Sequence, residues 1–151
     1  MTMSLLLKVC DYPMMIRLIY ASRAINLGPV DVKDILSSSR RNNHQLAVTG
    51  ALSLSNGIFL QCLEGERSAV NAVYHHILKD KRHNKPEILS LEEITQRQFT
   101  GWNMGLIAAT AENSALFLKY SSTSEFDPFT MSAPALKEFF AEVLSSARWL
   151  S

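Results

Sequence analysis

The alternation of apolar and polar positions predicts that regular structure begins with a strand. Residues 17–22 (RLIYAS) are largely apolar. Because successive side chains of a strand point to opposite faces, Leu18, Tyr20 and Ser22 should share one face. Tyr20 would then lie among apolar neighbours, where the ordinary reading is a buried phenol whose hydroxyl has found a hydrogen-bond partner.

A segment with helical spacing follows this strand. We expect a helix over residues 31–41, which opens with an aspartate able to cap it. Asn42 and Asn43 would follow its end, where asparagine is common because it tolerates the left-handed conformation, so one of them should be a cap. Ile35, Ser39 and Asn42 are spaced i, i+4, i+7, so one side of the helix offers one apolar and two polar side chains to a common neighbour.

A hairpin and a second helix are expected next. Two apolar runs, residues 46–54 and 58–63, are separated by a turn that contains Asn56-Gly57. Both turn residues tolerate positive φ, so the pair predicts a β-hairpin. Apolar residues then recur at i, i+3, i+4, i+7 and i+8 over residues 70–78, which is one face of a helix.

Two further strands complete the predicted sheet. A charged turn, residues 80–85, and Pro86 precede the apolar segments 87–94 and 104–109. The resulting order is β-α-β-β-α-β-β. Two helices on one face of a mainly antiparallel sheet form an α+β, ferredoxin-like arrangement, here with an added strand.

The character of the chain changes in its last part. Residues 115–120 predict a short helix and residues 133–149 an amphipathic one. This part is too short for a second domain, so we expect C-terminal helices that cover the open face of the sheet or contact a partner chain. The predicted organisation is an N-terminal extension (1–13), a folded domain (14–110) and a C-terminal helical cap (111–151).

Composition narrows the class of protein. With 151 residues, 47% apolar, 19% charged and a net charge of +1, the chain can bury a core and shows no basic stripe, which argues against nucleic acid. No apolar run is long enough to predict a membrane span. Cys10 and Cys62 match no metal or redox spacing, so we expect reduced thiols and a cytoplasmic protein.

Gln61 is the least ordinary residue of the predicted strands. It lies in the middle of an apolar run and shares its face with Phe59 and Leu63. A buried amide without partners costs about 1–3 kcal/mol. An edge position in contact with water is the alternative, and burial is the interpretation that we favour.

A polar cluster, Asp80, Arg82 and His83, follows the second helix. Most such clusters are solvated surface. A metal site built from His75, His76 and His83 has no supporting carboxylate or thiol spacing, so no metal is expected.

These residues together resemble the BLUF family of blue-light sensors using FAD. The resemblance runs from about Ile16 to Leu106, with the segments in the family's order and spacing. The segments are RLIYAS (17–22), SSSRRNN (37–43), VTGAL (48–52), FLQCLEG (59–65), ILKDKRH (77–83) and FTGWNMG (99–105).

The resemblance implies a flavin held between the two helices. Ile35 and Ile77 would press the two faces of its ring, and Asn43 would bond the pyrimidine edge. Asn42 and Ser39 would flank the ring. The implied cofactor is FAD, with FMN or riboflavin still open.

The resemblance also implies which residues hold the rest of the cofactor. Asp80, Arg82 and His83 match the ribityl and phosphate end, where a cation can pair with an anionic tail. Phe59 and Gln61 complete the expected flavin-binding set.

Tyr20 and Gln61 match the family's signalling pair. The implied mechanism is that Tyr20 gives an electron and then a proton to the excited flavin. The Gln61 amide is left rearranged, by rotation or tautomerisation, and a new hydrogen bond shifts the absorption to the red. An amide carries both donor and acceptor, so reversing it inverts a hydrogen-bond network without moving the backbone.

Trp102 and Met104 are the expected switch residues. They lie two apart on the predicted last strand and should therefore share a face. Met104 is the preferred candidate because a thioether adapts to a rearranged neighbour. Plain core packing is the alternative for both.

The helical cap resembles that of short BLUF proteins without an effector domain. This implies a photoreceptor that is not an enzyme, that forms a homo-oligomer and that signals to a downstream response protein. A flavin-dependent oxidoreductase on the same fold is the alternative, but the sequence offers no candidate base or nicotinamide motif. A module that has lost photochemistry is disfavoured by the presence of Tyr20 and Gln61.

Overall fold

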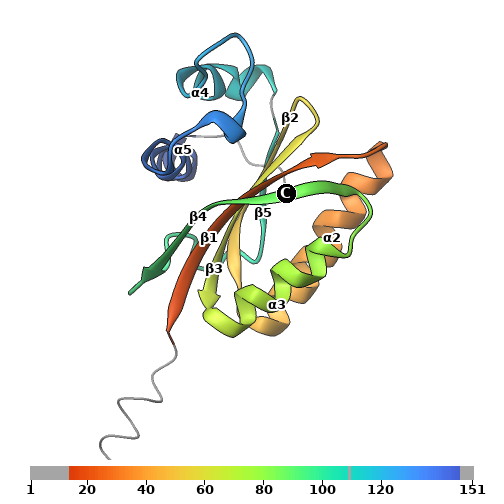
Figure 1. The fold of residues 1–151 in the computed structure, drawn as a ribbon, viewed down its shortest axis with the longest axis vertical. Helices are drawn as coiled ribbons and strands as arrows, with labels where there is room; N and C mark the ends of the chain where they lie inside the picture. Colours follow the sequence, from red (N-terminus) through yellow and green to blue (C-terminus); the bar gives the residue numbers. More distant parts are fainter. Residues whose placement is uncertain (1–13, 109, 147–151) are drawn as a thin grey trace, which may run out of the picture.

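The computed structural model describes residues 14–108 and 110–146 (Figure 1). The predicted N-terminal extension and Cys10 therefore lie outside the described residues. The elements of residues 14–108 are β1 (Met15–Ala24), α2 (Pro29–Leu46), β2 (Thr49–Ser55), β3 (Ile58–Glu66), α3 (Arg67–Leu78), β4 (His83–Ile94) and β5 (Gly105–Ala108). They are followed by the 3₁₀ turns η1 (Ala111–Asn113) and η2 (Pro128–Thr130) and by helices α4 (Ser114–Lys119) and α5 (Ala133–Ser146).

The five strands form one sheet in the order β4-β1-β3-β2-β5. Neighbouring strands are antiparallel except β2 and β5, which are parallel. The predicted α+β class and the β-α-β-β-α-β-β order are confirmed. β1 and β3 lie at the centre, so their side chains are covered on both faces.

Each face of the sheet is covered by its own pair of helices (Figure 1). Alternate residues of β1 divide between two hydrophobic cores. Leu18 and Tyr20 belong to the core beneath α2 and α3, whereas Ile19 and Ala21 belong to the core beneath α4 and α5. α4 and α5 thus cover the face of the sheet that α2 and α3 leave open, which is the first of the two roles expected for the C-terminal helices.

The first helix is longer than its sequence pattern predicted. It begins at Pro29, and Asp31 lies in its first turn and accepts a hydrogen bond from the Gly28 amide at 2.8 Å. It ends at Leu46, with Ala47 in the left-handed conformation at φ 54°. The helix therefore includes residues 42–46, and the expectation that an asparagine at 42 or 43 caps it is wrong.

β4 also begins earlier than expected. It starts at His83 and includes Pro86, whereas the prediction had a charged turn over residues 80–85 and a strand that began only after Pro86. Proline donates no backbone hydrogen bond, but β4 is an edge strand, and the β1–β4 register shifts next to this position. Lys85 has φ 49°, as at an irregularity in the strand.

Candidate flavin-binding site

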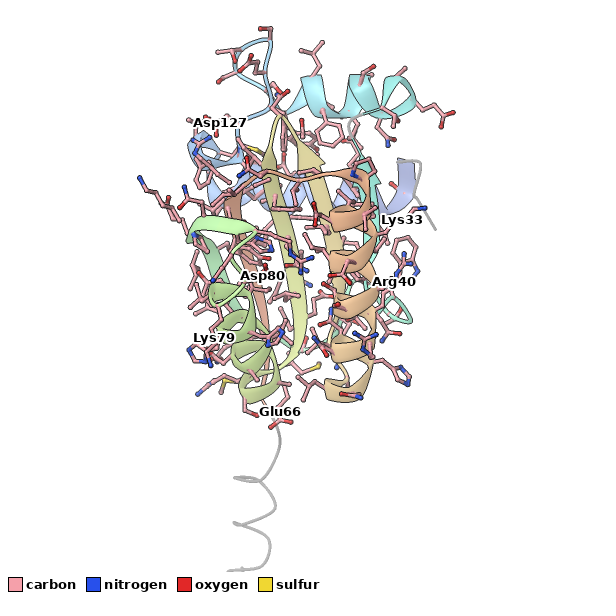
Figure 2. The ribbon with its side chains drawn as sticks, turned by 90° about the vertical axis from the view of Figure 1, so that its right-hand side faces the viewer. Lys33, Arg40, Glu66, Lys79, Asp80 and Asp127 are labelled. Atoms are coloured by element: carbon pink, nitrogen blue, oxygen red, sulfur yellow. The ribbon has the colours of Figure 1, made fainter. Side chains whose placement is uncertain are left out.

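The candidate site is a cleft between α2 and α3, with the sheet as its floor. Figure 2 shows the two helices side by side in front of the sheet. The cleft consists of two neighbouring hollows with volumes of about 260 and about 100 Å³. Ser39, Asn42, His76 and Ile77 line both hollows, so they form one continuous site.

The helix walls combine apolar and polar side chains. Ile35, Ser39 and Asn42 of α2 line the smaller hollow together with Ile77 of α3. These three residues therefore lie on one face of α2, as their spacing in the sequence predicted. A flat aromatic ring needs apolar walls with a few well-placed polar groups, and this cleft provides both.

Tyr20 and Gln61 form the floor of the smaller hollow. They are direct cross-strand partners in the β1–β3 pair, and the Tyr20 hydroxyl donates a hydrogen bond to Gln61 Oε1. Tyr20 is 0% and Gln61 3% exposed, so the expected burial of the amide is confirmed. Burial raises the pKa of Tyr20 well above its ordinary value, and the nearby Tyr74 and Asp80 act in the same direction. The phenol therefore keeps its proton at any physiological pH.

Met104 supplies the second contact of the Gln61 amide. Gln61 Nε2 lies 3.3 Å from Met104 Sδ, and the methionine is buried. Trp102 packs instead against the core beneath α5. The expectation that Trp102 and Met104 share a face is wrong, because both precede β5 in an irregular segment where strand alternation does not apply.

Three hydrogen bonds hold this irregular segment in place. The Gly50 amide donates to the Trp102 carbonyl at 3.0 Å. From α2, Asn43 Nδ2 donates to the Asn103 carbonyl at 2.8 Å and Arg40 Nε to the Met104 carbonyl at 3.0 Å. α2 thus fixes the backbone that places the thioether beside Gln61.

Asn43 also provides the test of whether a flavin fits. Its side chain is buried and lines the larger hollow, yet Oδ1 has no hydrogen-bond partner among the residues that the structure describes. A buried acceptor without a donor is costly. The pyrimidine edge of a flavin carries an N–H that could supply the donor, so the residues present fit the cofactor.

The polar cluster lies at the other end of the cleft. Asp80, Arg82 and His83 line the smaller hollow together with Tyr20 and Gln61, so the cluster is part of the site. Arg82 Nη2 lies 2.8 Å from Asp80 Oδ2 and Nη1 lies 2.8 Å from Asp34 Oδ2. The hydrogen bond from Arg82 holds the pKa of Asp80 below its ordinary value.

His83 connects this cluster to the floor. Its Nδ1 lies 2.7 Å from the Ser22 hydroxyl, and its ring centroid is 4.6 Å from that of Phe59. Burial lowers the pKa of His83, which favours the neutral imidazole. Phe59 lies beneath the histidine and is not among the residues that line either hollow.

Two further features considered in the sequence are a metal site and a membrane-spanning helix. In residues 14–108 and 110–146, no three His, Cys, Asp or Glu side chains are grouped as a metal site would require. None of the helices in these ranges has the length and apolar character needed to cross a membrane.

Comparison with known proteins decides the family. The family model described as "BLUF: Sensors of blue-light using FAD" matches residues 15–105. The chain belongs to the BLUF family. The matched residues contain the whole cleft, and flavin is therefore the cofactor of this BLUF protein.

Relatives and solved structures agree with this result. The photoactivated adenylate cyclase subunit beta of Euglena longa is 34% identical over 102 residues, which are 66% of this chain but 12% of that protein. The chain thus spans a small part of the curated relatives that it matches. The photo-activated state of BlsA superposes with a TM-score of 0.82 at 30% identity, covering 91% of this chain and 99% of that one. The dark-state structure of the BLUF protein BlrB gives 0.77 at 30% identity, covering 89% and 98%.

Sequence analysis missed two groups of residues near the site. Arg40 was not singled out, because an arginine on a helix gives no sign that it bonds a distant carbonyl. Glu64 and Arg17 were also missed, although a carboxylate within the apolar run of β3 is as unusual as Gln61. A charged residue in a central strand is the signal that could have identified Glu64.

Proposed function

We propose that light is sensed in this BLUF protein through the hydrogen-bonded pair Tyr20 and Gln61, and that the signal leaves through protein–protein contacts. The observation that carries the proposal is the hydrogen bond from the Tyr20 hydroxyl to Gln61 Oε1 in the buried floor of the cleft. This bond offers a single defined path for the phenolic proton.

The residues that would hold the flavin are those of the two helices and the polar cluster. Ile35 and Ile77 would contact the ring, and Asn43 Oδ1 would accept the pyrimidine N–H. When bound, the flavin supplies absorption of blue light and an oxidising excited state. Arg82 and Asp80 would lie toward the ribityl side of the cofactor.

The role of Tyr20 follows from its surroundings. A buried phenol resists losing its proton alone, because the phenolate would be an unsolvated charge. If the phenol loses an electron, it becomes strongly acidic and its proton can move along the existing hydrogen bond to Gln61 Oε1. The electron would pass to the excited flavin and the proton would follow it by way of Gln61, so Tyr20 would be left as a neutral radical and no isolated charge would remain in the core.

The role of Gln61 follows from its two unequal partners. Its oxygen accepts from Tyr20, whereas its nitrogen faces a thioether, which is a weak acceptor. Little is lost when the nitrogen leaves Met104, so the thioether opposes reversal of the amide only weakly. Reversal replaces a donor by an acceptor in the cleft without moving the backbone.

The C-terminal helices support the proposed output. α4 and α5 cover the face of the sheet opposite the cleft. The two central strands of the sheet, β1 and β3, have side chains on both the cleft face and this opposite face. Only the backbone of β3 separates Gln61 from the face that these helices cover, so a change at Gln61 can be transmitted to them across this one strand. We propose that this layer presents the signal to a response protein or to a second copy of the chain, without enzymatic turnover.

The test is an absorption spectrum of the flavin-bound protein before and after blue light. The wild type should show a red-shifted band that decays in darkness, and Tyr20→Phe should keep the flavin but lose the shift. Tyr74→Phe is the matched control, since that ring lies 5.3 Å from the Tyr20 ring outside the pair and should leave the shift intact. A Tyr20→Phe protein that photocycles like the wild type contradicts the proposed role of Tyr20.

A further inference from the structure

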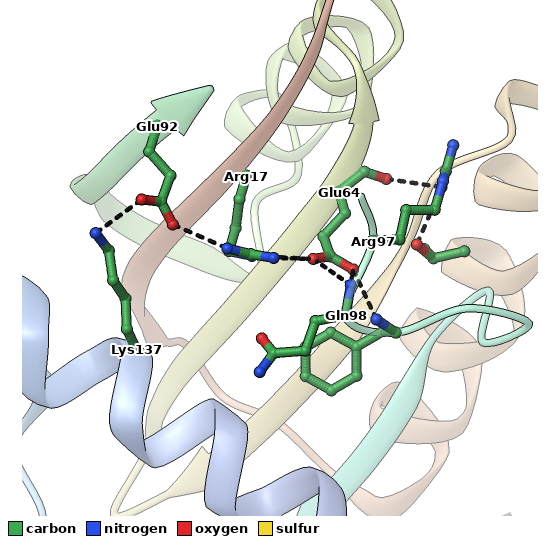
Figure 3. Close-up of polar contacts among 8 residues, drawn as sticks. Arg17, Glu64, Glu92, Arg97, Gln98 and Lys137 are labelled. Carbon is green, nitrogen blue, oxygen red and sulfur yellow. Dashed lines mark hydrogen bonds and ion pairs between the residues drawn. The ribbon is translucent and has the colours of Figure 1, made fainter. Parts of the chain in front are cut away.

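A buried carboxylate lies on the reverse side of the signalling strand. Glu64 follows Gln61 by three residues on β3, so it points to the face covered by α5. Its side chain is 0% exposed. Arg17 of the neighbouring β1 donates to Glu64 Oε2 from Nε at 2.9 Å and from Nη2 at 2.7 Å (Figure 3).

The same carboxylate holds the segment that leads to Met104. The backbone amide of Gln98 donates to Glu64 Oε2 at 3.0 Å, and that of Phe99 donates to Oε1 at 2.8 Å. Arg97 adds a bond from Nη1 to the Glu64 carbonyl at 3.2 Å. The segment 98–104 is thus tied to β3 at its start and to α2 at its end, where the sulfur of Met104 faces Gln61.

A chain of charges continues from Glu64 to the C-terminal helix. Arg17 Nη1 lies 2.9 Å from Glu92 Oε1 on β4, and Glu92 Oε2 lies 2.8 Å from Lys137 Nζ on α5 (Figure 3). Side-chain exposure rises along this path, from 0% at Glu64 to 17% at Arg17, 29% at Glu92 and 42% at Lys137. The contact at the α5 end is therefore screened by solvent and weaker than the buried end.

Apolar packing joins α5 to this part of the sheet only in part. The Phe99 ring lies edge-on to that of Phe140 on α5, with 6.2 Å between their centroids. A hollow of about 460 Å³ lies here between the sheet and the helix, and Arg17, Gln98 and Lys137 are among the residues that line it. The segment 98–104 therefore has two connections to α5, the apolar contact of Phe99 with Phe140 and the charged chain that starts at Glu64.

We propose that Glu64 is a positioning residue of the light reaction, which holds Met104 against Gln61 and couples the segment 98–104 to α5 through Arg17, Glu92 and Lys137. This inference rests on the proposed function of Gln61. A displacement of the segment would remove backbone donors from a buried carboxylate, which is unfavourable, so the carboxylate resists movement of Met104. Coupling is reciprocal, and a change at α5 must act back on the amide.

The test measures the rate of dark recovery in Glu64→Gln, Lys137→Gln and the double variant. Glu64→Gln keeps the shape of the side chain, but its amide N–H₂ then faces backbone N–H groups that need an acceptor. The rate of dark recovery should therefore change by roughly fivefold or more. Lys137→Gln alone should change it by about twofold, and the double variant should recover like Glu64→Gln, because the path is already broken. Glu93→Gln is the matched control, since its side chain is 71% exposed, and it should recover like the wild type.

The outcomes separate this inference from the proposed function. If the wild type shows no light-induced shift, both are overturned. If it shows the shift but Glu64→Gln recovers at the wild-type rate, only the positioning role is overturned. If the fold-changes in recovery rate caused by Glu64→Gln and Lys137→Gln multiply in the double variant, the two residues act independently and the coupling to α5 is overturned. If Glu64→Gln does not bind flavin, Arg17→Lys replaces it, because this variant keeps the charge but loses the two-point contact, and the same rates decide.

Discussion

The side chains of Trp102 and Met104 lie on opposite faces of the sheet although the residues are only two apart. Met104 is 3% exposed in the core beneath α2 and α3, with its sulfur beside Gln61 Nε2. Trp102 packs beneath α5, with its ring 6.3 Å from that of Phe99. Of these two side chains, it is therefore Met104 that contacts the amide.

Replacing each of these two residues should have unequal effects. Met104→Leu keeps the volume but removes the weak acceptor at Gln61, so we expect dark recovery to change by about threefold or more. Trp102→Phe changes only the core on the other face and should leave the rate within about twofold. Time-resolved absorption after a blue flash measures both. Equal effects of the two substitutions would assign Trp102 a part in the cleft.

Removal of the Gln61 amide should cost both signal and stability. In Gln61→Leu the Tyr20 hydroxyl loses its acceptor while it remains buried, so the free energy of unfolding should fall by about 1–3 kcal/mol. The light-induced shift should disappear while the flavin stays bound. Denaturant unfolding and an illuminated spectrum measure these effects, with the exposed Gln96→Leu as control. An unchanged shift in Gln61→Leu would refute the role of the amide.

Arg82 should distinguish among the possible flavins. Its guanidinium is already paired with Asp80 and Asp34, and a cofactor phosphate would draw on the same charge. We expect Arg82→Gln to weaken the binding of FAD and FMN by about tenfold and that of riboflavin much less. Titration of each flavin measures this, with the exposed Lys79→Gln as control. An equal loss for all three flavins would exclude a phosphate contact at Arg82.

The neutral state of His83 makes stability depend on pH. Burial lowers its pKa in the folded chain, against the opposing effect of Asp80, while an unfolded histidine titrates near 6.5. As the pH falls, the unfolded chain therefore takes up this proton before the folded chain does. The contribution of neutral His83 to the free energy of unfolding is present above about pH 6.5 and is lost as the pH falls below it. We expect the melting temperature to fall more between about pH 7.5 and 5.5 in the wild type than in His83→Gln. Parallel curves for the two proteins would contradict this assignment.

Much of the fold followed from local patterns. The alternation in residues 17–22 correctly divided β1 between two faces, and Asn56-Gly57 marked the hairpin of β2 and β3. The same alternation put Tyr20 and Gln61 on buried faces. Their direct pairing required the β1–β3 register, which depends on contacts between strands distant in sequence and has no local signal.

The errors arose where tertiary contacts replace local preferences. Asn43 was expected near a helix end from its residue type, but its amide bonds the Asn103 carbonyl and the helix continues past it. Trp102 and Met104 were placed on one strand, but hydrogen bonds from Gly50, Asn43 and Arg40 hold their segment in an irregular conformation. No periodicity in the sequence can indicate such bonds, because their partners lie far along the chain.

The division of β3 between two cores has a consequence for how proteins of this fold can diverge. Gln61 and Leu63 lie on the face covered by α2 and α3, whereas Cys62 and Glu64 lie on the face covered by α4 and α5. Substitutions that remodel the outer layer can therefore accumulate without repacking the cofactor cleft, provided that the acid on the strand keeps its donors. Evolution or design could attach a different receiver to the same photochemical unit by exchanging only the helices on the far side.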